Sequence, residues 1–190
     1  MKRMKQIIFI LIAILVAIPT ISQAQELSKK EQRQLNKQLK KEQKAEEDAR
    51  KAAIVGLMME HGRFVLEADQ LRDKRGNTVN VSSMINFIAS DSTIGVVQIG
   101  SNSYVGMNGV GGITVEGRIS NYEAIFNGKN GTYSVTYNIN SPLGAFTVRM
   151  TAFPGGRADA TVSSNWPGKV NYSGYLVPPA ASKVYKGSSL

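Results

Sequence analysis

Residues 132–152 read TYSVTYNIN, SPLG and AFTVRMTA, and these three segments decide the fold. In the first and last segments an apolar residue stands at nearly every second position, with serine, threonine, asparagine or arginine between. That period of two is typical of strands with one buried and one solvated face, as in antiparallel sheets. The segment between them contains the proline and glycine of a tight turn. The stretch therefore predicts a β-hairpin.

The same pattern extends in both directions from residue 63 onward, so we expect a mainly β protein. The predicted strands are residues 63–72, 79–90, 94–100, 112–126, 132–140, 145–152, 157–164 and 169–177. In the fourth strand the apolar phase slips after Ile119, which predicts a β-bulge near Asn121. Successive hairpins without an intervening helix favour an eight-stranded antiparallel meander that closes into a barrel, because closure removes exposed edges. A two-sheet sandwich is the alternative architecture.

Residues 25–62 differ in composition, since they are rich in Lys, Glu, Gln and Ala and contain no proline. The S-x-x-E spacing of residues 28–31 is that of a capping box. His61 followed by Gly62 supplies a basic last turn and a left-handed stop. We therefore predict one long N-terminal α-helix from about Lys29 to His61. A polar and amphipathic helical segment, residues 25–62, thus precedes a barrel domain, residues 63–190.

The two halves of this helix carry different patterns. From Ala45 onward apolar residues recur as a stripe, so this half has a face to bury. Before Ala45 the large apolar residues are Leu35 and Leu39, and several lysines and arginines stand three or four apart. The front half is interpreted as a solvated tail, a spacer from the membrane or a partner-binding helix.

The first 24 residues have the three parts of a secretory signal. A basic head precedes twelve consecutive apolar residues, Ile7–Ile18, and the small residues Ser22 and Ala24 follow. Twelve residues fall short of the roughly 20 that a membrane-spanning helix needs. We predict cleavage near Ala24, a periplasmic or secreted protein, and no transmembrane anchor after cleavage.

Composition excludes several kinds of chemistry. The chain has no cysteine and one histidine, which excludes disulfides, thiolate metal sites, cysteine nucleophiles and histidine-rich metal sets. We expect no cofactor. Removal of the signal leaves 20 basic and 14 acidic residues, a net charge of +6. The usual role of such an excess is solubility; as an indication of partners, it favours anionic lipid headgroups or acidic glycans over nucleic acid.

Acid–base catalysis has weak support in the sequence. The candidate carboxylates are Glu67, Asp69, Glu116 and Asp159, and the first two share the face of a strand that we expect to point to water. We therefore predict that the protein is not an enzyme. A glycan-acting enzyme is the third-ranked hypothesis.

The apolar rows of the strands predict the ligand-binding residues. Eight-stranded barrels can be filled by their own side chains or can hold one small ligand. The long loop at residues 101–111 is a candidate lid. The residues predicted to meet a ligand are Tyr133, Val135, Tyr137, Phe146, Val148, Met107 in that loop, and Trp166 at a turn.

Five short segments resemble a family of exported bacterial proteins known as domain of unknown function 4251. These are INFI (85–88), GGITVEG (111–117), SNY (120–122), GYLVP (174–178) and VYKG (184–187). The resemblance covers roughly residues 46–188. It implies export into the envelope of a Gram-negative bacterium and a lipocalin-like barrel, and it carries over no catalytic residue.

The preferred hypothesis is a non-enzymatic periplasmic binding module with a small apolar or lipid-like ligand in the barrel. The alternative is a cell-envelope structural or interaction protein that contacts an envelope component through the N-terminal helix.

Overall fold

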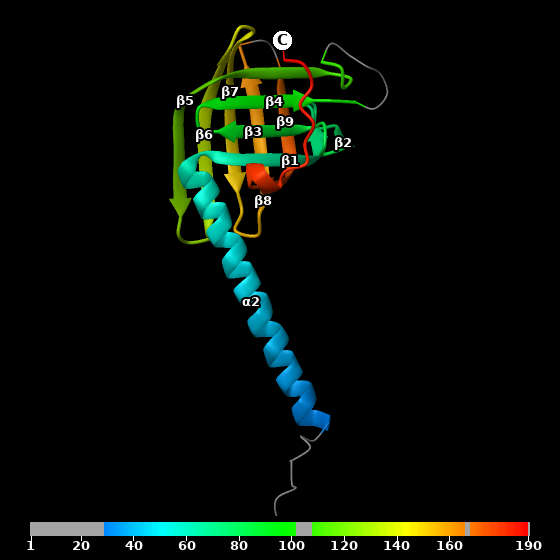
Figure 1. Ribbon diagram of the computed structural model, residues 1–190, viewed down its shortest axis with the longest axis vertical. Helices are drawn as coiled ribbons and strands as arrows, with labels where there is room; N and C mark the ends of the chain where they lie inside the picture. The colour runs from blue at the N-terminus through cyan, green and yellow to red at the C-terminus, as the bar shows by residue number, and fades with distance from the viewer. Residues whose placement is uncertain (1–28, 102–107, 166–167, 190) are drawn as a thin grey trace, which may run out of the picture. The chain divides into compact units, whose positions relative to one another are not determined.

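The computed structural model describes residues 29–101, 108–165 and 168–189 (Figure 1). The predicted signal segment, Met107 and Trp166 lie outside the described residues. The chain divides into two compact units, residues 1–44 and residues 45–190.

One long helix, α2 (Lys29–His61), confirms the predicted helix at both ends. It ends where Gly62 adopts a φ of 63°, a left-handed conformation that glycine reaches without steric cost. The buried residues of α2 are Val55, Gly56, Met58 and Met59, all in the half with the apolar stripe. Every described residue before Ala45 is exposed.

Nine strands follow the helix in the described part of the chain, and eight of them form a closed barrel. The strands are β1 (Arg63–Arg72), β2 (Thr78–Asn80), β3 (Phe87–Asp91), β4 (Ile94–Ile99), β5 (Ile113–Asn127), β6 (Thr132–Ser141), β7 (Gly144–Ala152), β8 (Arg157–Ser164) and β9 (Lys169–Val177). From β3 to β9 each strand pairs with the next along the chain, β3 pairs with β1, and β9 pairs with β1 to close the ring. All these pairings are antiparallel, and the β1–β9 pairing closes one continuous sheet, which confirms the meander barrel and excludes the sandwich. In Figure 1, β1, β3 and β4 run roughly horizontally, and β7, β8 and β9 run roughly vertically.

The predicted strand at residues 79–90 is wrong, because the structure breaks it into β2 and β3. β2 pairs with the last residues of β1, whereas β3 pairs with its first five. Between them Asn86 is buried and its side chain bonds to main-chain groups. Its Nδ2 donates to the Ser82 carbonyl at 3.0 Å, and its Oδ1 accepts from the Gly100 N–H at 3.0 Å. These bonds hold a turn where the apolar alternation alone suggested continuous strand.

The predicted bulge in β5 is confirmed. Asn121 has a φ of 52°, and the register between β5 and β6 shifts between Ser120 and Glu123. The extra residue turns Tyr122 toward the helix, where its hydroxyl donates to the Met59 carbonyl at 2.5 Å. The bulge therefore ties β5 to the last turn of α2.

A continuous apolar core fills much of the barrel and includes residues of α2. Val55, Met58 and Met59 pack in the same cluster as inward-facing residues of the strands. The phenol ring of Tyr137 meets Phe64 edge-on, with 6.3 Å between ring centroids. Burial of such aromatic and aliphatic groups is the main stabilising contribution to this unit.

The C-terminal strap, residues 178–189, crosses the outside of the barrel over β1, β3 and β4 (Figure 1). It starts with a short 3-10 helix, η1 (Pro179–Ala181). Val184 of the strap packs against a second apolar cluster formed by Val65, Phe87 and Val96 on the outer face. This part of the barrel is therefore buried on both faces.

Gln98 on β4 is fully buried beneath the strap, and both ends of its amide are hydrogen-bonded. Its Nε2 donates to the carbonyls of Tyr185 at 2.9 Å and of Ile85 at 3.1 Å. Its Oε1 accepts from the Gly187 N–H and from the Thr114 hydroxyl, both at 2.8 Å. One side chain thus connects the strap to β4, β5 and the turn before β3.

Three interior tyrosines make the stability of the barrel sensitive to alkaline pH. Burial raises the pKa of Tyr122 to about 12 and also raises the pKa of Tyr137 and of Tyr172, both of which are fully buried. The unfolded chain ionises these phenols near pH ~10. The folded state keeps them neutral, so their contribution is complete below pH ~10 and is lost as pH rises toward the folded-state pKa values.

We expect the free energy of unfolding to fall between about pH 9 and pH 11, by about 1.4 kcal/mol for each tyrosine that stays neutral in the folded state. Urea titrations at the two pH values measure this loss. Tyr172→Phe and Tyr137→Phe should each reduce the loss by that amount. An equal loss in both variants and the parent would contradict the assignment.

Candidate functional site

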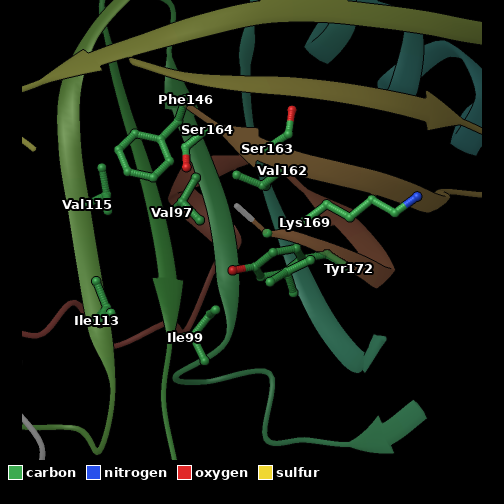
Figure 2. A pocket seen from close by; sticks show the side chains of 12 residues that line it. Val97, Ile99, Ile113, Val115, Phe146, Val162, Ser163, Ser164, Lys169 and Tyr172 are labelled. Carbon is green, nitrogen blue, oxygen red and sulfur yellow. The ribbon is translucent and has the colours of Figure 1, made fainter. Parts of the chain in front are cut away.

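An apolar pocket with a volume of about 240 Å³ lies within the barrel (Figure 2). It is formed where β4 and β8 end and where β5 and β9 begin. Its lining residues are Val97, Ile99, Ile113, Val115, Phe146, Val162, Ser163, Ser164, Gly168, Lys169, Val170 and Tyr172.

The pairing register explains why these side chains meet. Val97 of β4 lies opposite Val115 of β5, so both point inward from neighbouring strands. On the other wall Val162 of β8 lies opposite Val170 of β9. Because side chains alternate along each strand, these positions share the inner face. Figure 2 shows the two walls facing each other across the pocket.

Tyr172 forms part of the pocket wall with its ring. It is fully buried, and its hydroxyl donates to the Gln98 carbonyl at 3.4 Å. Because the hydroxyl proton is donated to this main-chain carbonyl, it is not available to a ligand. The ring therefore contributes apolar surface.

Two of the polar residues in the lining stand at the edge of the pocket. Ser163 and Lys169 are register partners on the outward face of β8 and β9. Figure 2 shows the Lys169 ammonium group pointing away from the valine and isoleucine side chains. The surface of the pocket is thus mainly apolar, which suits an apolar ligand and offers little for acid–base chemistry.

The predicted ligand-binding residues lie in different parts of the structure. Phe146 lines the pocket. Val135, Tyr137 and Val148 face the barrel interior, as their alternation predicted, but they are packed in the core and do not line the pocket. Tyr133 stacks on Phe126 at 4.9 Å, and its hydroxyl donates to Glu60 at 3.2 Å.

Sequence reasoning missed most of the pocket wall. Val97, Val115 and Val162 carry the same alternation signal as the core valines. The difference is that the core near α2 also receives Val55, Met58 and Met59, whereas the pocket is lined by strand residues and Gly168. The alternation predicts which residues face inward, but it does not predict at which end of the barrel the residues of α2 pack.

The four candidate carboxylates lie apart from this pocket, each bonded to a neighbour. Glu67 accepts from the Ser182 hydroxyl at 2.7 Å, and Asp159 accepts from the Ser173 hydroxyl at 2.6 Å. Asp69 lies 3.6 Å from Arg157. Lys186 donates to Glu116 at 2.6 Å, and this bond lowers the pKa of the Glu116 carboxyl.

The part of the chain that the structure describes contains no group of three or more histidine, aspartate and glutamate side chains that could hold a metal ion. In the same ranges, no helix is both long enough and apolar enough to cross a membrane.

A second hollow, of about 380 Å³, lies on the outer face of β6 to β9. Its wall is mainly polar and includes Arg72, Arg149 and Asp159. Several of its side chains bond to each other across the strands; for example, the Thr161 hydroxyl donates to Asn171 at 2.7 Å. This surface is a hydrogen-bonded polar face, and its chemistry differs from that of the apolar pocket.

Comparisons with known proteins agree with the resemblance seen in the sequence. No curated protein matches the chain. The crystal structure of a DUF4251 family protein from Bacteroides eggerthii is similar, with a TM-score of 0.60 and 29% sequence identity, over 70% of this chain and 91% of that chain. A family model, the domain of unknown function DUF4251, matches residues 46–176, which is more than half of the chain. The chain therefore belongs to the DUF4251 family.

Proposed function

We propose that the protein is a non-enzymatic binding module that takes a small apolar or lipid-like ligand into the barrel pocket. The observation that carries this proposal is the mainly apolar lining of a pocket within a closed barrel. A rigid barrel supplies such a site in preformed shape, so little conformational entropy is lost on binding.

The size of the pocket limits the ligand. Ligand sites for drug-sized molecules span about 300–1,000 Å³, and an apolar cavity of about 150 Å³ already accepts a benzene ring. A volume of about 240 Å³ therefore fits a molecule of one or two rings, or the end of an acyl chain. Burial of the ligand's apolar surface supplies the driving force, at roughly 25 cal/mol per Å² before the costs of association.

The proposal includes export. The basic head, apolar run and small residues of positions 1–24 support a cleaved signal and a periplasmic or secreted product. The mass of the protein isolated from its own host tests this point, because cleavage after Ala24 leaves a chain that begins at Gln25.

Filling the pocket should abolish binding without unfolding the barrel. Val162→Phe places a ring in the pocket, and the free volume accepts it. With naphthalene, a neutral fluorescent probe of two rings, we expect one molecule bound per chain and at least tenfold weaker binding by this variant. Fluorescence titration measures both, and the thermal unfolding midpoint checks the fold.

The matched control is Val79→Phe, which adds the same ring at an exposed position on β2. It should bind the probe as the parent does. Equal binding by Val162→Phe and the parent would place the probe elsewhere. Absence of probe binding, together with an unliganded mass for protein isolated from its host, would overturn the proposal.

A further inference from the structure

The front half of α2, residues 29–44, is strongly basic and fully exposed. It contains seven basic residues and two acidic ones, a net charge of +5. The basic residues are Lys29, Lys30, Arg33, Lys37, Lys40, Lys41 and Lys44.

These seven cations lie on one side of the helix. With 3.6 residues per turn, they fall within an arc of about 120° and extend over about 22 Å of the helix axis. The two acids, Glu31 and Glu42, fall on the opposite side, as do Leu35 and Leu39. We call the row of seven cations the cationic stripe.

Helix stability does not explain the cationic stripe. Its members stand three or four residues apart, where like charges disfavour the helix. Among the described residues none of the seven forms an ion pair. The ion pair of α2 joins Lys51 and Glu47, at 2.7 Å, in the half that packs on the barrel. The stripe therefore leaves its charge available to an external partner.

The arrangement of the other side chains indicates what kind of anion fits. A helix that binds a lipid surface by insertion carries an apolar face bordered by cations. Here the leucines lie opposite the cations and beside the acids, so the cationic side has no apolar residue to insert. The segment also has no aromatic residue on which nucleic-acid bases could stack. Cations that follow one another along one side of a helix are arranged to pair with anionic groups that follow one another along a linear polymer.

We propose that the cationic stripe is a docking site for a linear acidic polysaccharide, whose carboxylate or sulfate groups pair with successive lysines and arginines. This inference concerns residues 29–44 and is independent of any ligand in the barrel.

The test exchanges neighbouring residues, so that composition and net charge stay constant. The exchanged variant swaps the residues of three neighbouring pairs and so moves three of the seven cations off the stripe. The substitutions are Gln32→Arg with Arg33→Gln, Lys37→Gln with Gln38→Lys, and Gln43→Lys with Lys44→Gln. The probes are polygalacturonate, which carries carboxylates, and heparin, which carries sulfates. Affinity is measured by titration calorimetry with the purified protein over a series of salt concentrations.

We expect the parent to bind at least one of the two polysaccharides at least tenfold more tightly than the exchanged variant. Counterion release sets the slope of log affinity against log salt in proportion to the cations engaged, so the slope should fall by about 40% in the variant. The control variant Lys74→Gln, Arg75→Gln and Lys129→Gln removes three exposed cations of the barrel unit and should bind within twofold of the parent.

Near-ultraviolet circular dichroism of the tyrosines checks that the barrel is intact in both variants. Equal affinities of the parent and the exchanged variant would overturn the proposal, as would a loss in the barrel control of the same size. Binding to phosphatidylglycerol vesicles or to oligothymidylate that is tighter than binding to both polysaccharides would also overturn it.

Discussion

Replacement of Gln98 by alanine is expected to lower the free energy of unfolding by about 3–5 kcal/mol, because several buried groups lose their partners together. The Gly187 N–H and the Tyr185 carbonyl both bond to this amide beneath the strap. The Thr114 hydroxyl loses its acceptor in the same change. Each buried polar group left unsatisfied costs about 1–3 kcal/mol.

Urea unfolding followed by circular dichroism measures this effect. Gln70→Ala is the matched control, because the Gln70 amide makes an exposed bond to Asn80 at 3.4 Å and its loss should cost less than about 0.5 kcal/mol. If Gln98→Ala unfolds within about 1 kcal/mol of the parent, the strap is not held by this side chain.

Gly174→Ala, which adds a methyl group, should lower the free energy of unfolding by about 3 kcal/mol or more. Gly174 lies on β9 at the seam where the barrel closes on β1. A Cβ there would stand 2.0 Å from the Glu67 carbonyl oxygen and 2.7 Å from the Ala68 Cα. Both obstacles are main chain, so no side-chain rotation relieves them.

Gly155→Ala serves as the control for Gly174→Ala. Gly155 lies in the turn before β8, and no heavy atom stands within 4 Å of the position a Cβ would take. This change should alter stability by less than about 0.5 kcal/mol. Similar unfolding midpoints for the two variants would show that β1 and β9 can separate without penalty.

The sequence predicted most of the fold because the signals are local. The alternation in residues 132–152 and the turn residues between strands gave the meander, and the capping and stop signals gave α2 at both ends. The phase slip after Ile119 gave the bulge, since an extra residue reverses the apolar face. The break at Asn86 was missed because its partner, the Gly100 N–H, lies 14 residues away and leaves no mark on the alternation.

The candidate site was harder to predict for the same reason. The alternation placed Phe146, Val135 and Val148 on the inner face alike, but only Phe146 of these three lines the pocket. Val97 and Val162 line the pocket from strands that do not follow one another in the chain, and their proximity depends on the register of the whole ring. Gln98 seemed an ordinary outward residue of β4, because the strap that buries it lies nearly 90 residues later.

The seam between β1 and β9 also has a consequence for biosynthesis. Val65 pairs with Val177, 112 residues later, so the edge of β1 that faces β9 remains unpaired until β9 has been synthesised. Such a long sequence separation slows folding, and an open strand edge invites association with other chains. Closure of the β1–β9 seam is therefore the folding step after which this edge can no longer pair with another chain.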